Sequence, residues 1–144
     1  MLSANIDKKP KIVNIISMPQ GGGAEFLTRE LHKIFRERGL DSTVIYSCSQ
    51  IDNLDENEIV LGCSPRSFLN IFRIRKILRE ISRSSNNKLI VHAHLTWPLF
   101  FTTLAVIGIP HVNLIYTEHD TWNKRRKIPF SRFLDFFFTG NSKK

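Results

Sequence analysis

Three consecutive glycines, Gly21 to Gly23, follow an apolar strand pattern over residues 12–16 and precede a helical pattern. The first turn of a helix leaves backbone N–H groups unpaired and carries a partial positive charge, and glycine allows a ligand to approach both. The run is no full dinucleotide fingerprint, because Phe26 stands where a third glycine belongs and no Lys-Ser/Thr pair follows. The pattern favours an anion site, and the alternative is a glycine turn that only lets the helix pack close to the sheet.

Histidines and carboxylates form a second group of residues that could do chemistry. His92 and His94 stand two residues apart in a strand pattern, and Glu118 and His119 follow another strand pattern. Residues i and i+2 of an extended segment point the same way, so these four side chains could complete a metal site. No zinc motif such as HExxH is present, and we predict no metal. General acid–base chemistry is the second possibility, with His119 as the best candidate, since a nearby carboxylate can fix the tautomer of a histidine. The alternative is a histidine that only pins the loop after its strand.

Basic residues gather in the second half of the chain. Residues 1–64 hold seven Lys and Arg against nine Asp and Glu, a net charge of −2, whereas residues 65–144 hold fourteen against four, a net charge of +10. Arg73 and Lys76 lie on a predicted amphipathic helix, and a second basic run precedes a phenylalanine-rich segment; that run is Lys124, Arg125, Arg126 and Lys127. Cations beside apolar side chains suit an anionic membrane surface. Motifs that stack nucleic-acid bases are missing, so we do not expect a nucleic-acid partner.

Strand and helix patterns alternate along the chain and must position these groups. The predicted strands are residues 12–17, 42–46, 58–63, 88–92 and 112–117, and the predicted helices run from the glycines to Gly39, from Ser64-Pro65 to Ser84 and from Thr96 to Gly108. Such an order predicts an α/β fold, a doubly wound, mostly parallel sheet with helices on both faces. The carboxyl ends of parallel strands meet at one edge, so the glycines, the histidine pair and the segment 118–120 should converge there. His32 and His111 are predicted to be structural or solvated.

The size and composition of the chain fit a single domain. With 144 residues and 42% hydrophobic residues it can bury one core over residues 11–144, after a polar, flexible tail at residues 1–10. Cys48 and Cys63 are expected to be small buried residues in a reduced compartment, which favours the cytoplasm. The apolar stretch 95–109 is shorter than the ~20 residues that span a bilayer, and we expect a buried helix there.

Three short segments at the strand ends carry a family resemblance. They are Gly22-Gly23-Ala24-Glu25, Val91-His92-Ala93-His94 and Tyr116-Thr117-Glu118-His119. In order and spacing the chain, over roughly residues 11–135, resembles the amino-terminal domain of family 4 glycosyltransferases. The resemblance implies a retaining glycosyltransferase with two facing Rossmann-like domains, a nucleotide sugar held between them as co-substrate, and no metal or other cofactor.

The resemblance also implies roles for particular residues. The loop Gly21 to Gly23, with Glu25, would approach the donor phosphates and substrate, and His119 would face the transferred sugar. His119 and Glu118 are therefore the catalytic candidates, and His94 and Glu118 would line the acceptor side. Arg73, Lys76 and the basic run at residues 124–127 would serve a lipid-linked acceptor or the inner face of a membrane.

The family pattern continues beyond what this sequence holds. The donor nucleotide is gripped mainly by a carboxy-terminal domain with an E-x7-E pattern, which this chain lacks. The resemblance therefore implies a truncated acceptor-side half that is inactive alone and partnered by a separate donor-binding domain. A non-enzymatic remnant or a binding module for an anionic lipid or polysaccharide precursor is the alternative.

Overall fold

The computed structural model describes residues 9–48, 52–84 and 88–119, which form a parallel sheet with helices on both faces. The tail predicted at residues 1–10 therefore lies almost wholly outside the described residues. In chain order the elements are β1 (Lys11–Ile16), α1 (Gly23–Glu37), β2 (Ser42–Tyr46), β3 (Glu58–Val60), α2 (Leu69–Ser84), β4 (Leu89–His94), α3 (Thr96–Val106) and β5 (Val112–Thr117).

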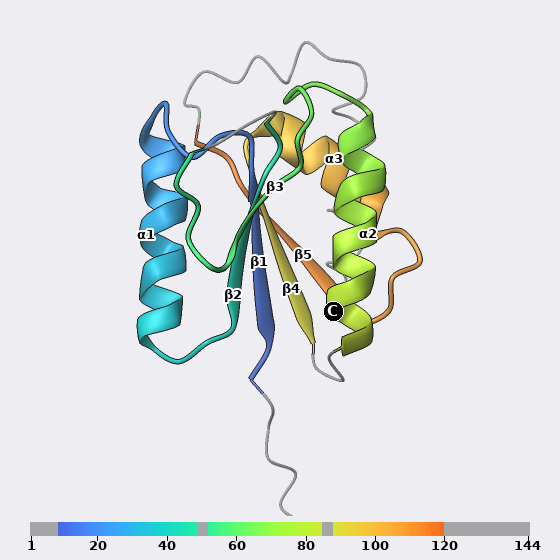
Figure 1. The fold of residues 1–144 in the computed structure, drawn as a ribbon. Helices are drawn as coiled ribbons and strands as arrows, with labels where there is room; N and C mark the ends of the chain where they lie inside the picture. The colour runs from blue at the N-terminus through green and yellow to red at the C-terminus, as the bar shows by residue number, and fades with distance from the viewer. Residues whose placement is uncertain (1–8, 49–51, 85–87, 120–144) are drawn as a thin grey trace, which may run out of the picture.

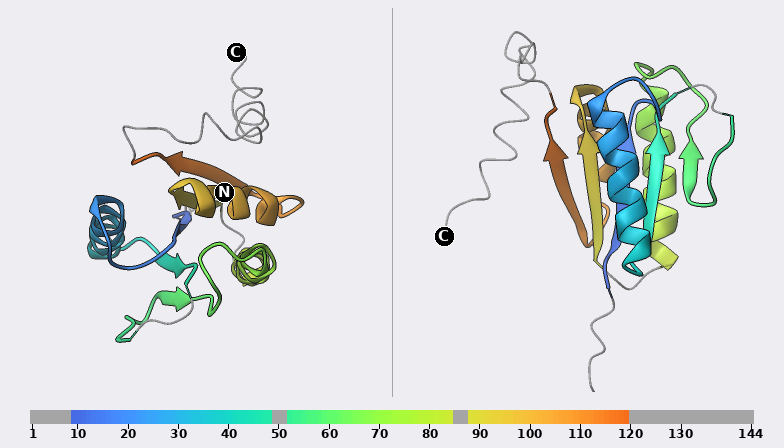
Figure 2. Two further views of the ribbon diagram at one scale, coloured as in Figure 1. Left: turned by 90° about the horizontal axis from the view of Figure 1, so that it is seen from above. Right: turned by 90° about the vertical axis from the view of Figure 1, so that its left-hand side faces the viewer.

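The sheet has the doubly wound topology that the sequence predicts. Its strand order is β3-β2-β1-β4-β5, and all four neighbouring pairs are parallel. Figure 1 shows α1 on one side of the sheet and α2 and α3 on the other, and the view from above in Figure 2 separates the same layers. The chain winds outward from β1 in both directions, so the carboxyl end of β1 lies at the point where the strand order reverses.

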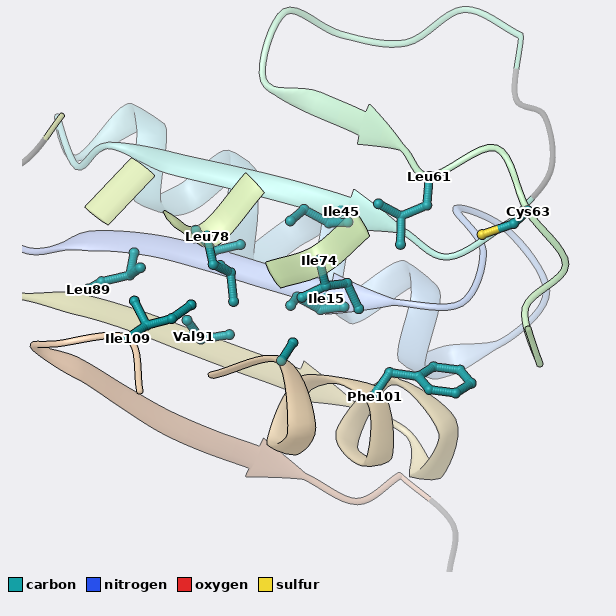
Figure 3. Close-up of a cluster of buried hydrophobic side chains, with 12 residues drawn as sticks. Ile15, Ile45, Leu61, Cys63, Ile74, Leu78, Leu89, Val91, Phe101 and Ile109 are labelled. Carbon is teal, nitrogen blue, oxygen red and sulfur yellow. The ribbon is translucent and has the colours of Figure 1, made fainter. Parts of the chain in front are cut away.

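The larger apolar core lies between the sheet and the pair α2 and α3 (Figure 3). Ile15 and Val91 reach it from the sheet, Ile74 and Leu78 from α2, and Phe101 from α3, and all five are 0% exposed. Both cysteines are buried, as the sequence predicts, and neither forms a disulfide within the described residues. No helix within the described ranges is long and apolar enough to cross a membrane.

Several element boundaries differ from the sequence-based expectation. The strand predicted over residues 58–63 already ends at Val60. The helix predicted from Ser64-Pro65 begins only at Leu69, because Ser64 closes a turn by accepting from the Ser67 N–H, and the Ser67 hydroxyl then accepts from the Leu69 N–H. The strand predicted to end at His92 runs on to His94, so both histidines belong to β4 and share one face of it.

The buried face of α1 is small and polar. Ala24, Thr28 and His32 face the sheet, whereas the apolar Leu27 is 42% exposed and Ile34 38%. The sheet surface below explains this choice, because it carries buried polar side chains, and a helix face of short and hydrogen-bonding residues can satisfy them. His32 is buried with its Nδ1 2.9 Å from Ser42 Oγ, and His111 is exposed.

Candidate functional site

The strand register brings the three suspected segments to one edge of the sheet. β1 pairs with β4 up to Ile15 opposite Ala93, and β4 pairs with β5 up to His94 opposite Thr117. The glycine loop after β1, the end of β4 and the residues after β5 therefore leave the sheet at the same level. This is the convergence that the sequence predicts.

The glycine loop forms the start of α1. Gly22 is the N-cap, and no side chain caps the helix. Gly21 has φ +146°, a region that L side chains rarely adopt, and a Cβ at Gly23 would meet no atom within 4 Å. Open space therefore lies beside Gly23 in the first turn, and the Glu25 carboxylate lies next to Gly21 and Gly22.

A pocket of about 370 Å³ opens where this loop meets the end of β5. Its lining consists of Gly22, Gly23, Ala24, Glu25, Leu95 and His119. A helix N-terminus attracts an anion, whereas a carboxylate and an imidazole nitrogen accept hydrogen bonds from hydroxyl groups. The pocket therefore offers complementary chemistry to a ligand that carries both phosphate and sugar hydroxyls.

Three histidine rings stack below and beside this pocket. His94 Nδ1 lies 3.1 Å from His119 Nε2, with ring centroids 5.4 Å apart, and the His92 and His94 centroids are 4.0 Å apart. Burial, followed by the neighbouring rings of His92 and His119, lowers the pKa of His94 to about 3. Burial and then His119 also lower the pKa of His92, whose Nε2 lies 2.7 Å from the Thr117 hydroxyl. His92 and His94 are thus held neutral.

The residues predicted for the site are divided between exposed and buried positions. His94 is 0% exposed, so it can act on a ligand only through His119, while Glu118 is exposed and is not among the residues that line this pocket. Gly21 lines a different, larger pocket of about 700 Å³ on the other side of the loop.

The basic residues predicted for a surface also differ in their environments. Arg73 and Lys76 are both exposed, but Arg73 also donates to the Leu61 carbonyl and so joins α2 to the segment after β3. The run Lys124 to Lys127 lies outside the described residues.

The sequence reasoning missed two groups of residues around the site. Asn14 and Ser42 are buried polar residues beneath α1, and a signal for Asn14 was present, since it is the one polar residue in the apolar run from Ile12 to Ile16. Leu95 lines the pocket with φ +71°, a strained conformation that turns the chain sharply from β4 into α3, and no sequence signal marks it.

Metal binding finds no support in this arrangement. The part of the chain that the structure describes contains no group of three or more His, Cys, Asp or Glu side chains placed to hold a metal ion. The three histidines instead use their ring nitrogens on one another, on Thr117 and on Asn14.

Open α/β sheets bind ligands outside the carboxyl ends of their strands, next to the point where the strand order reverses. The topology thus defines a Rossmann-like α/β domain, and the pocket at the start of α1 lies at the edge where such sheets bind ligands. The family model Glycosyltransferase Family 4 matches residues 21–142. The chain therefore belongs to glycosyltransferase family 4, which confirms the resemblance carried by its three strand-end segments. No curated protein matches the chain.

Proposed function

We propose that this chain is the acceptor side of a retaining glycosyltransferase that moves a sugar from a nucleotide sugar to a glycan or lipid-linked acceptor. The family match supports transfer of a sugar, and one observation favours this edge of the sheet. The pocket at the start of α1 joins unpaired helix N–H groups to Glu25 and His119.

The residues of the pocket take different roles in this proposal. The N–H groups of Gly23 and Ala24 approach the donor phosphates, because the helix start carries a partial positive charge. Glu25 and His119 accept hydrogen bonds from sugar hydroxyls, and the exposed Glu118 meets the acceptor from outside the pocket. A carboxylate as close to the loop as Glu25 repels phosphate, which favours phosphate at Gly23 and hydroxyls at Glu25.

Sugar transfer by the chain tests this proposal. Labelled nucleotide sugars and lipid-linked acceptors are incubated with the chain alone and with a separately produced donor-binding domain of the E-x7-E type. We expect product in the mixture and little with the chain alone, because a single open domain neither excludes water nor preorganises both substrates. His119→Ala should lower the rate at least tenfold and the exposed His111→Gln should not, whereas equal rates in both variants would contradict the role of His119.

A second candidate function, a non-catalytic module for an anionic lipid surface, is favoured by α2. Leu69, Phe72, Lys76, Arg79 and Arg83 recur at helical spacing on its outer face and are all exposed. Leu69 is 55% and Phe72 69% exposed, and the three cations form no ion pair among the residues that the structure describes. Apolar side chains at one end of a stripe and cations along the rest match the interior and the head groups of an anionic bilayer, where each cation contributes about 1 kcal/mol.

Vesicle binding tests the lipid module. The chain should bind vesicles that contain anionic phospholipid and lose binding with salt, and it should not bind neutral vesicles. The double variant Arg79→Glu with Arg83→Glu should lower vesicle binding at least tenfold. The control Lys33→Glu with Arg38→Glu makes the same change in net charge on and next to α1 and should retain most of the binding. Equal losses in the two double variants would show attraction by net charge alone and would contradict a binding face on α2.

A further inference from the structure

A continuous line of polar side chains crosses the molecule between α1 and the sheet. Asn14 on β1, Ser42 on β2 and His94 on β4 are at most 1% exposed and occupy the sheet face that α1 covers. His32 reaches them from α1, and His119 from the residue pair after β5. Four of these polar groups, on four different segments, are buried, and His119 is partly buried. Buried polar groups in an apolar layer must satisfy one another.

The distances along this line connect it into one chain of hydrogen bonds. His119 Nε2 lies 3.1 Å from His94 Nδ1, and His94 Nε2 lies 3.5 Å from Asn14 Oδ1. Asn14 Nδ2 donates to Ser42 Oγ over 3.5 Å, and Ser42 Oγ lies 2.9 Å from His32 Nδ1. Every member therefore has one neighbour on each side, except the two terminal histidines.

Along this chain of hydrogen bonds, the donors and acceptors follow one another in a single direction. Asn14 Oδ1 can only accept, so the neutral His94 carries its proton on Nε2 and accepts at Nδ1 from His119 Nε2–H. Asn14 Nδ2 can only donate, so Ser42 accepts from it and turns its own proton toward His32 Nδ1. All three histidines of the chain then carry their proton on Nε2.

The two ends of the chain reach two different pockets. His119 lines the pocket of about 370 Å³ at the start of α1. His32 lines the pocket of about 700 Å³ between α1 and the segment before β3, where Arg29, Arg36, Asp55 and Glu58 surround it. The line of hydrogen bonds thus connects the candidate substrate pocket with a second groove along α1, and the two pockets also share Gly22 in their linings.

We propose that Asn14 is a positioning residue that sets the tautomers of His94 and His119 on one side and of His32 on the other. His119 in its neutral form then keeps Nδ1 free of a proton, so it accepts a hydrogen bond from a hydroxyl of the substrate and does not donate one to phosphate. This assignment of a hydroxyl to His119 rests on the proposed function, whereas the tautomers themselves do not.

Histidine nitrogen spectra of the full chain test the tautomers without any substrate. In protein labelled with ¹⁵N-histidine at pH 8, long-range ¹H–¹⁵N correlations distinguish an Nε2–H ring from an Nδ1–H ring. We expect the Nε2–H pattern for His32, His94 and His119. An Nδ1–H pattern at His94 would mean that donors and acceptors are exchanged along the whole chain of hydrogen bonds, and it would overturn the proposal.

Asn14→Asp should change the two sides of the chain differently. A carboxylate accepts from both neighbours, so His94 keeps its proton on Nε2, while Ser42 now donates toward Asp and accepts from His32. His32 should therefore switch from the Nε2–H to the Nδ1–H pattern, and the exposed His111 should not change. An unchanged His32 in the folded variant would overturn the proposal.

Ser42→Ala is a second, milder variant in case the buried carboxylate prevents folding. It removes only the link between Asn14 and His32, so His94 and His119 should keep the Nε2–H pattern while His32 loses its single tautomer. A change at His119 would show that Asn14 does not set that side.

A titration with nucleotide sugars and glycans then separates this proposal from the proposed function. If the tautomers are as expected and a sugar changes the chemical shift of His119 Nδ1, both the positioning role and the proposed function are supported. If the tautomers are as expected and no ligand shifts His119, the positioning role stands and the glycosyltransferase proposal for this pocket fails.

Discussion

At the scale of single residues, the imidazole rings of the site lie so close together that protonation of two neighbouring rings at the same time is unfavourable. The ring centroids of His92 and His94 are 4.0 Å apart, and those of His94 and His119 are 5.4 Å apart. Burial removes the water that would stabilise a cation, so His94 stays neutral far below the pH at which an exposed histidine is protonated. A neutral His94 can accept a hydrogen bond from His119 at any pH near neutrality.

The lowered pKa of His94 predicts that the protein loses stability in mild acid. An unfolded histidine binds a proton below pH 6.5, whereas His94 in the folded protein binds one only near pH 3. The contribution of His94 to the free energy of unfolding is therefore fully present above pH 6.5 and is lost as the pH falls toward 3. The loss from His94 alone should be about 2 kcal/mol between pH 7 and pH 5. Urea denaturation at several pH values measures it; His94→Gln should flatten the dependence and the exposed His111→Gln should not. An equal slope in the two variants would contradict the assignment.

A second residue-scale prediction concerns the buried carboxylate of Glu58. Tyr46 Oη donates to Glu58 Oε1 over 2.6 Å, and Arg29 Nε lies 3.7 Å from the same oxygen. Burial and this hydrogen bond raise the pKa of Tyr46. Tyr46→Phe should lower the free energy of unfolding by about 1.5–3 kcal/mol, since a buried charge loses its shortest hydrogen bond. A double-mutant cycle with Glu58→Gln measures the coupling, and a coupling near zero would contradict it.

At the scale of elements, two glycines of the same loop should respond differently to alanine. Gly21 has φ +146°, so Gly21→Ala should lower the free energy of unfolding by about 1–3 kcal/mol, regardless of the space around the added methyl group. A Cβ at Gly23 meets nothing within 4 Å, and alanine favours the helix, so Gly23→Ala should keep or slightly raise stability. Its methyl group nevertheless occupies space beside the N–H groups of the pocket. Urea denaturation combined with calorimetric binding of nucleotide sugars separates the two effects, and full binding by Gly23→Ala would contradict a phosphate site there.

Sequence patterns predicted most elements because their signals are local. The strands Ser42–Tyr46 and Val112–Thr117 match the predicted bounds, since β-branched and apolar runs end at turn residues there. The start of α2 was wrong by several residues, because the choice between Ser64 and Ser67 as the cap depends on contacts with the preceding strand. Such contacts are not local in sequence.

The orientation of α1 shows what periodicity alone does not determine. Leu27 and Ile34 recur at helical spacing but are 42% and 38% exposed, and the helix buries Thr28 and His32. Asn14 and Ser42 on the sheet below account for this orientation of the helix, because they need hydrogen-bonding partners that apolar residues cannot supply. The candidate site was predictable as three segments at one edge, whereas the hydrogen bonds beneath it were not.

At the scale of the whole molecule, the two faces of the sheet differ in kind. The face under α2 and α3 carries the larger apolar core (Figure 3). The face under α1 carries a smaller apolar cluster around Ile16 and Val44 together with the polar chain, whose two ends reach the two pockets. Basic side chains lie along the outer side of α2. The pocket proposed for the substrate and the stripe on α2 proposed for a lipid surface thus lie on opposite layers and can be tested by separate variants.

The central claim is that the pocket at the start of α1 receives the sugar substrate. Titration of ¹⁵N-labelled chain with a panel of nucleotide sugars and glycans, followed by amide and histidine shifts, tests it most directly. The account predicts shifts at Gly22, Gly23, Glu25 and His119 that are lost in Gly23→Ala. Shifts confined to Arg29, Lys33 and Arg36 in the larger groove, or no shift with any ligand, would contradict it.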